Sequence, residues 1–126
     1  RYRITATSVL GALGAFIEAQ PQTPNDKNHS LRVLFNAPNV SAIDRLFRER
    51  FGVRDIVSGY GMTEVNMCAL GRCGSPRPGA AGWILHDMFD VAVVDPLTDC
   101  ELPHGQVGEI VVRPKIPFVF MQGYQG

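Results

Sequence analysis

The feature that most constrains this chain is a change of pattern at a stretch crowded with glycine and proline. These residues fill positions 71–82 so densely that neither a helix nor a strand can persist there. Before this stretch, helix-like and strand-like patterns alternate, and after it only strand-like patterns occur. We therefore expect an α/β part over residues 1–70, a Gly/Pro-rich loop over residues 71–82 and a β part over residues 83–126.

The first part reads as helix, strand, helix and strand. Apolar residues recur at helical spacing over residues 7–19, and a short apolar run at 31–35 is typical of a strand buried on both faces of a parallel sheet. Ser41 is predicted to be the N-cap of a second, amphipathic helix that Gly52 terminates. Residues 53–57 follow as a second short strand. This order predicts one α/β layer.

The last part reads as antiparallel strands. Residues 90–95 and 108–113 are rich in valine and isoleucine, a turn signal at Pro96–Asp99 lies between them, and Pro114 closes the second run. The fold class predicted from the sequence is α/β followed by β.

Charge and composition exclude several classes of protein. Lys+Arg 12 balance Asp+Glu 12, so we expect no nucleic-acid partner, and no apolar run approaches the ~20 residues of a transmembrane segment. Three cysteines without C-x-x-C spacing predict neither a disulfide framework nor a zinc site, and they favour a reducing, cytoplasmic location. The chain opens without an initiator Met or a signal-peptide pattern, so we expect an excised segment of a longer protein.

The segment with the clearest chemical potential is residues 58–64, directly after the predicted strand 53–57. In open α/β sheets, ligands bind beyond the carboxyl ends of the strands. Glycines here permit close backbone approach, an aromatic ring can stack on a base, a hydroxyl can donate to a phosphoryl oxygen, and a carboxylate suits Mg²⁺. The residues are Gly59, Gly61, Tyr60, Thr63 and Glu64. The same types at this spacing also fit a plain Gly-rich turn with a packed tyrosine.

The run Gly-Tyr-Gly-Met-Thr-Glu at residues 59–64 resembles the core motif of the adenylate-forming (AMP-binding) superfamily. This superfamily comprises acyl- and aryl-CoA ligases, luciferases and the adenylation domains of peptide synthetases. Met62 points to the acyl-CoA ligase branch. Further segments resemble the family in the same order along the chain, namely Ser30–Arg32, Arg50–Gly52, Gly74–Gly79, Gly108–Arg113 and Gly123-Tyr124.

The resemblance implies an ATP-dependent acyl-CoA ligase, which activates a carboxylic acid as acyl-AMP and transfers the acyl group to coenzyme A. The cofactor and co-substrates implied are ATP, Mg²⁺ and coenzyme A. The fold implied is part of a doubly wound α/β subdomain plus strands of a small β-barrel, together a fragment of the large N-terminal domain. The family's phosphate loop, ribose-binding Asp and C-terminal Lys have no counterpart in this chain, so we expect the chain alone to be inactive.

The resemblance also implies roles for single residues. Thr63 and Glu64 are the catalytic candidates, with Glu64 as the Mg²⁺ ligand, and Gly59 and Gly61 are expected to line the acyl pocket. The nucleotide-binding candidates are Asn36, Ala37, Pro38, Tyr60, Gly61, Met62 and Thr63. Three later residues are expected to belong to the scaffold, namely Glu109, Arg113 and Tyr124.

One segment departs from the family. Residues 35–38 read Phe-Asn-Ala-Pro where the family has a Gly-Gly-Ala-Pro-like loop beside adenine. With Phe-Gly-Val-Arg at residues 51–54, this altered loop resembles the crotonobetaine/carnitine-CoA ligase branch. The alternative is a non-catalytic nucleotide-binding or interaction module on the same scaffold. Either way, exposed sheet edges of such a segment predict association with a second copy or strand exchange.

Overall fold

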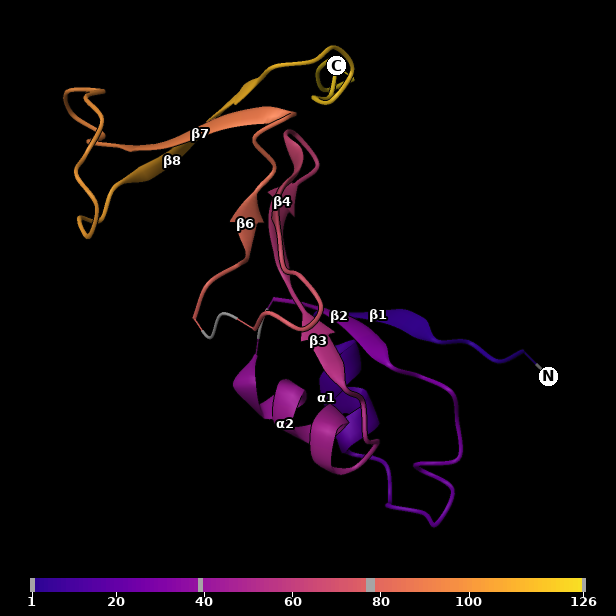
Figure 1. Cartoon of the computed structure of the whole chain (residues 1–126). Coiled ribbons are helices and arrows are strands. Elements are labelled where there is room, and N and C mark those ends of the chain that lie inside the picture. Colours follow the sequence, from indigo (N-terminus) through magenta and orange to yellow (C-terminus); the bar gives the residue numbers. More distant parts are fainter. Residues whose placement is uncertain (1, 39, 77–78, 126) are drawn as a thin grey trace. The chain divides into compact units, whose positions relative to one another are not determined.

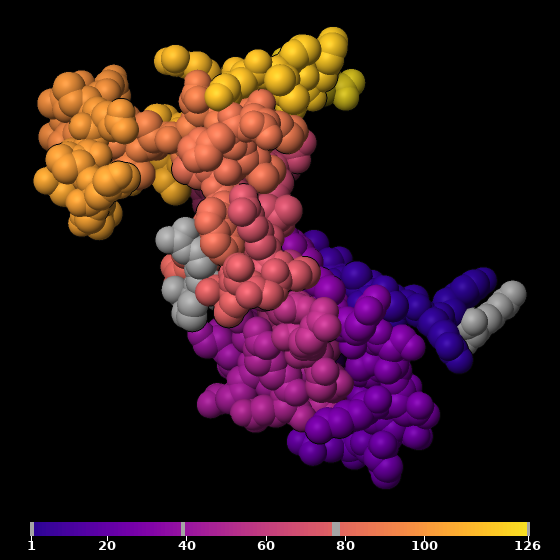
Figure 2. All heavy atoms as spheres, in the orientation of Figure 1, coloured from indigo at the N-terminus to yellow at the C-terminus, as the bar shows by residue number. Residues whose placement is uncertain are grey.

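The computed structural model describes residues 2–38, 40–76 and 79–125. The chain divides into two compact units, and each is considered by itself. One unit comprises Arg1–Tyr60 with Leu70–Trp83, and the other comprises Gly61–Ala69 with Ile84–Gly126. Figure 1 traces the helices and strands of both, and Figure 2 shows the atoms in the same orientation and colours.

The first unit is built on a parallel sheet of three strands. The strands are β1 (Ala6–Leu10), β2 (Val33–Ala37) and β3 (Asp55–Val57), and they lie side by side in that order. Helix α1 (Leu13–Glu18) connects β1 to β2, and helix α2 (Ser41–Glu49) connects β2 to β3 (Figure 1). Parallel neighbours need such crossover connections, and the chain supplies one helix for each.

The core of this unit lies where both helices meet the sheet. Burying one large aliphatic or aromatic side chain stabilises a fold by roughly 1.5–3 kcal/mol. The five buried residues of this core therefore contribute much of the free energy that stabilises the unit. Glycine at position 14 lets α1 approach α2, because a Cβ there would lie 2.9 Å from Ile43 Cδ1. The buried residues are Val9, Leu34, Ile43, Phe47 and Val53.

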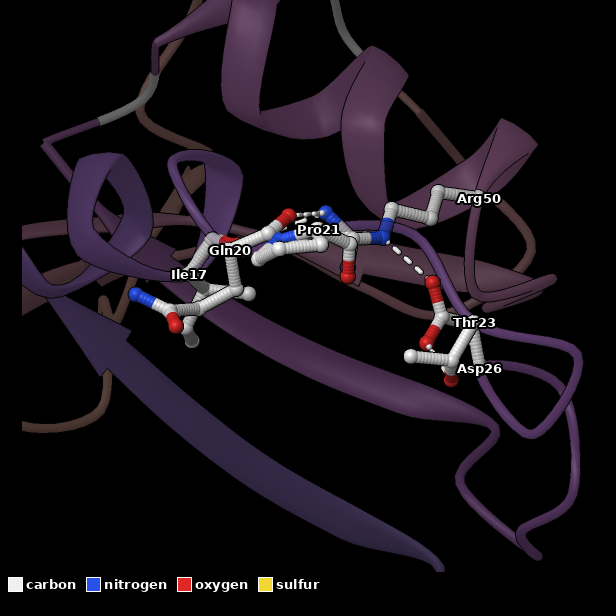
Figure 3. A network of polar contacts seen from close by, with 6 residues as sticks. All are labelled: Ile17, Gln20, Pro21, Thr23, Asp26 and Arg50. Atoms are coloured by element: carbon white, nitrogen blue, oxygen red, sulfur yellow. Dashed lines mark hydrogen bonds and ion pairs between the residues drawn. The ribbon is translucent and has the colours of Figure 1, made fainter.

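Arg50 ties the loop after α1 to the end of α2. Its Nη1 donates to the carbonyl oxygen of Gln20 and its Nη2 to that of Pro21, both at 2.8 Å. Figure 3 shows the side chain extended toward these carbonyls and toward Asp26. The guanidinium also lies 4.9 Å from the centre of the Phe51 ring. One side chain thus fixes a loop that contains two prolines and has no regular structure of its own.

The helix predicted over residues 7–19 is wrong in its first half. Residues 6–10 form strand β1, and the helix begins only at Leu13. Val9 is buried in the strand, and Gly11 adopts φ +54°, a conformation that separates strand from helix. Apolar residues at Val9 and Leu10 serve a buried strand as well as a helix, and pairing with β2 decides between the two.

The remaining elements of the first unit agree with the sequence apart from their ends. The strands predicted at 31–35 and 53–57 are β2 and β3, each beginning two residues later than expected. The second helix is confirmed, but Ser41 is its first residue and not its N-cap. Val40 holds the cap position and makes no side-chain bond there. Gly52 terminates the helix as predicted, with φ +71°.

The second unit contains the antiparallel pair that the sequence predicts. Strands β7 (Phe89–Val94) and β8 (Glu109–Pro114) pair from Phe89 opposite Pro114 to Val94 opposite Glu109. Phe89 is fully buried, and its ring stacks on Phe120 with 6.2 Å between the centroids. This aromatic pair anchors the segment that follows β8.

Three short strands were not predicted. They are β4 (Gly59–Met62), β5 (Asn66–Leu70) and β6 (Trp83–Ile84), and they form a second three-stranded sheet in that order. In the Gly/Pro-rich stretch, described residues 71–76 and 79–82 contain no helix or strand, and Arg77 and Pro78 lie outside the described residues. Among the described residues, the architecture is therefore mixed α/β with three small sheets. Among the helices described, none is long and apolar enough to cross a membrane.

Candidate functional site

One edge of the parallel sheet collects several of the predicted site residues. Phe35 of β2 lies opposite Val57 of β3, so the chain beyond these two residues runs toward the same edge of the sheet. Beyond Phe35 come Asn36 and Ala37, the last two residues of β2, and then Pro38, and beyond Val57 the chain reaches Gly59 and Tyr60 at the start of β4. The end of β1 reaches this edge too, because Gly11 N donates to Ala37 O at 3.0 Å. All of them belong to the first unit, at the position where open α/β sheets bind ligands.

The side chain of Asn36 is engaged within the protein. Asn36 is 3% exposed, and its Nδ2 donates to Asp44 Oδ1 in the first turn of α2 at 2.9 Å. A buried amide that lost this acceptor would cost free energy, so the bond holds α2 against the end of β2. The Asn36 amide therefore already has a hydrogen-bond partner within the protein.

A cavity of ≈ 240 Å³ lies beside this edge, within the first unit. Its walls come from α2, from the end of β3 and from the Gly/Pro-rich stretch, and they include two arginines and one aspartate. Arg48 already donates to the carbonyl oxygen of Arg54 at 2.7 Å, and Arg72 lies over the Trp83 ring at 5.1 Å. The polar and charged lining residues are Ser41, Asp44, Arg48, Ser58, Arg72 and Ser75.

Strand β4 carries the core motif into a tight turn with β5. A Cβ at Gly61 would lie 2.3 Å from the carbonyl oxygen of Asn66, so glycine is required here for the chain to approach its own backbone. Asn66 itself adopts φ +60°. Met62 is half-exposed, and Thr63 is exposed in the turn. The sequence predicts that Gly61 allows a ligand to approach the backbone closely. In the structure the group close to Gly61 is the backbone of Asn66 in the same turn.

Glu64 is held by two hydrogen bonds from the segment around Tyr124. It is half-buried, its carboxylate Oε1 accepts a hydrogen bond from the Tyr124 hydroxyl, and its carbonyl oxygen accepts one from Met121 N at 3.3 Å. The bond from Tyr124 holds the pKa of Glu64 below its ordinary value and raises the pKa of the Tyr124 hydroxyl. Glu64 is therefore an ionised carboxylate at neutral pH.

A single ionised carboxylate is a suitable Mg²⁺ ligand when a substrate supplies phosphates. Mg²⁺ commonly binds through one or two carboxylates plus phosphate oxygens and waters. The described part of the chain holds no cluster of three or more His, Cys, Asp or Glu that would form a protein cage for a metal. The donor set at Glu64 fits a metal that arrives with a nucleotide.

The sequence does not predict the bond between Tyr124 and Glu64. Nothing local marks Tyr124 as a partner of a residue 60 positions earlier. The predicted residues fall in both units: Gly59 and Tyr60 end one stretch of the first, and Gly61–Glu64 open the second.

Comparison with known proteins identifies the class. The sequence profile of the family described as "AMP-binding enzyme" matches residues 1–125, so the chain belongs to that family. A crotonobetaine/carnitine-CoA ligase of Salmonella typhi is 32% identical over 115 residues, and one of Shigella sonnei is 34% identical over 119 residues. Each match covers 90% of this chain and 22% of the relative, so the chain spans about a fifth of the length of the curated relatives it matches.

Solved structures give the same result. Apo MatB from Rhodopseudomonas palustris superposes with a TM-score of 0.74 at 30% identity, covering 94% of this chain and 24% of that one. ATP-bound MatB from the same organism gives 0.75 at 30% identity, covering 94% and 23%. A benzoate CoA ligase from Burkholderia xenovorans LB400 gives 0.72 at 23% identity, covering 88% and 23%, and this likeness concerns the fold alone. The family predicted from the core motif is thus confirmed.

Proposed function

We propose that this chain is part of an ATP-dependent acyl-CoA ligase, which activates a carboxylic acid as acyl-AMP and transfers the acyl group to coenzyme A. The observation that carries the proposal is the register of β2 and β3, because Phe35 lies opposite Val57 and the motif begins at Gly59, two residues beyond Val57, at the carboxyl edge of the parallel sheet. The names of the matched relatives, which are CoA ligases, support the same activity.

In this proposal the motif residues bind and orient ATP. Tyr60 stacks on adenine, with Asn36, Ala37 and Pro38 as neighbours, and the Thr63 hydroxyl donates to an oxygen of the α-phosphate. Glu64 holds Mg²⁺, which when bound offsets negative charge on the phosphate oxygens. Gly59 and Gly61 line the acyl pocket, and Met62 completes the nucleotide-binding turn.

The chemistry needs positioning more than proton transfer. The substrate carboxylate is ionised near neutral pH, so its oxygen attacks the α-phosphorus without a general base, and pyrophosphate leaves. In the second step the coenzyme A sulfur attacks the acyl carbonyl carbon, the thiol loses its proton, and AMP leaves. The Thr63 donor acts on charge that develops during the first step.

Several finer statements belong to the same proposal. In the whole protein, the β1–β3 sheet forms part of a doubly wound subdomain, and β7 and β8 form strands of a small barrel. We likewise propose that the parts of the chain divide at residues 70 and 82 and that the protein is cytoplasmic. We also propose that this chain alone is inactive and that it associates with a second copy. Crotonobetaine and carnitine are the first acids to test, because the matched relatives bear those names.

A non-catalytic module is the second candidate, and Asn36 is the observation that favours it. Its buried bond to Asp44 shows that the segment 35–38, which differs from the family pattern, has a structural role within the fold. The two candidates separate when the whole protein is incubated with ATP, Mg²⁺, coenzyme A and short, aromatic, long-chain and betaine-like acids. A ligase yields an acyl-CoA of the expected mass with one of them. A protein that binds ATP and yields no thioester with any acid supports the module.

A further inference from the structure

We propose that Tyr124 is a positioning residue that holds the Glu64 carboxylate in the orientation needed for Mg²⁺, an inference that rests on the proposed function of Glu64. Both residues belong to the second unit. The bond between them joins the core motif to a segment that was expected to be scaffold.

Two contacts fix Glu64 at both of its ends. Tyr124 donates its hydroxyl hydrogen to Oε1, and Met121 donates its backbone N–H to the Glu64 carbonyl oxygen at 3.3 Å. The donors lie three residues apart on one segment. This segment therefore restrains the backbone and the side chain of Glu64 together, in a turn whose neighbour Thr63 is exposed.

The segment that carries these donors is itself anchored. Val119 is buried, and Phe120 stacks on Phe89, which is fully buried at the start of β7. Lys115 N also donates to Met88 O at 2.8 Å, which fixes the chain where β8 ends. Tyr124 thus reaches Glu64 from a tethered segment, although the residue itself is 79% exposed.

The chemistry of the pair suits a metal ligand. A carboxylate has two oxygens and about four lone-pair sites, so a bond accepted at Oε1 leaves Oε2 available to a cation. The phenol is neutral and a donor, so it orients the carboxylate without competing for the metal. Hydrogen-bonding partners of metal ligands commonly change metal affinity or activity by about 10–100-fold when they are removed.

The test uses the whole protein and two substitutions. Binding of a non-hydrolysable ATP analogue is measured by calorimetry against free Mg²⁺ for wild type, Tyr124→Phe, Glu64→Ala and the double variant. We expect Tyr124→Phe to raise the Mg²⁺ midpoint about tenfold. In the Glu64→Ala background the same change should shift the midpoint less than twofold, because Tyr124 acts through Glu64. Tyr2→Phe, at an exposed position in the first unit, is the matched control and should leave the midpoint unchanged.

The outcomes separate the inference from the proposed function. A wild-type midpoint in Tyr124→Phe, or an equal shift with and without Glu64, would overturn the positioning role. Equal thermal midpoints of unfolding for wild type and Tyr124→Phe show that the shift is not a loss of folding. Failure of the whole protein to form any thioester overturns the ligase proposal, while the Mg²⁺ midpoint still decides the role of Tyr124. Analogue binding that does not depend on Mg²⁺ in wild type overturns the proposed Mg²⁺ role of Glu64 and, with it, the positioning role of Tyr124.

Discussion

Arg50 Nε lies 2.5 Å from Asp26 Oδ2, and this ion pair joins the end of α2 to a loop residue 24 positions earlier. Asp26 also accepts a bond from the Thr23 hydroxyl at 2.7 Å (Figure 3). The pair is enclosed, with 8% of the Arg50 side chain and 14% of the Asp26 side chain exposed. The loop is thereby held beside the sheet whose far edge carries the candidate site.

Replacing Arg50 by lysine tests this fixation. A lysine keeps the charge but cannot bridge a carboxylate and two carbonyl oxygens in the planar arrangement of a guanidinium. We expect Arg50→Lys to lower the thermal midpoint of unfolding by about 5 °C. Arg45→Lys, at an exposed position on the same helix, should change it by less than about 1 °C. Equal midpoints for both variants would contradict the role given to Arg50.

The acid side of the stability curve should depend on Asp26. The Thr23 hydroxyl, and after it Arg50, hold the pKa of Asp26 below its ordinary value of 3.8. Because the folded pKa is the lower one, this contribution is present above pH 3.8 and disappears as the pH falls through the folded pKa. We expect Asp26→Asn to be less stable than wild type in urea at pH 7 and nearly equal to it in strong acid. A pH-independent difference, or a change as large in the exposed-site variant Asp87→Asn, would refute this.

Gly61 should tolerate no side chain. Alanine there would place Cβ 2.3 Å from the Asn66 carbonyl oxygen and 2.8 Å from Met67 Cα, which are backbone atoms that cannot turn aside. We expect Gly61→Ala to destabilise the fold by about 1–3 kcal/mol in urea unfolding and to reduce activity, because the turn carries Thr63 and Glu64. Gly74→Ala meets no heavy atom within 4 Å and bears only the strain of φ +73°, so it should retain activity. Full activity of Gly61→Ala would show that the turn can shift.

Asn36 offers a test of which group at the sheet edge meets a nucleotide. Asn36→Ala removes the buried bond to Asp44, and we expect it to reduce the free energy of unfolding by about 1–2 kcal/mol. ATP affinity should change less than about threefold, because the Asn36 amide is buried and already bonded to Asp44. An unchanged stability with a large loss of ATP binding would instead place the Asn36 amide at the nucleotide.

The sequence predicted those elements whose signal is local. Helix α2 was predictable because Ile43 and Phe47 repeat at helical spacing and both are buried. Residues 6–10 were misread because an apolar pair at Val9 and Leu10 fits a helix and a buried strand equally well. The pairing of β1 with β2, across more than twenty residues of sequence, has no local signature.

The candidate site shows the same division. The Gly-Tyr-Gly-Met-Thr-Glu motif sufficed to predict the family, because its residue types and order are specific. The sequence could not show that Gly61 packs against the Asn66 backbone of its own turn, or that Asn36 bonds to Asp44. Nor could it pair Tyr124 with Glu64, because that contact depends on a segment held in place by Phe89 and Phe120.

Acid-dependent exchange of labelled pyrophosphate into ATP by the whole protein tests the adenylating function most directly. It isolates the first step, and it is run with the panel of acids for wild type, Thr63→Ala/Glu64→Ala and the exposed-site control Thr5→Val. We predict that one class of acid drives exchange, that the double variant loses at least about 100-fold of it, and that Thr5→Val retains it. Exchange of equal rate in the double variant, or no exchange with any acid from a folded protein that binds ATP, would contradict the proposal.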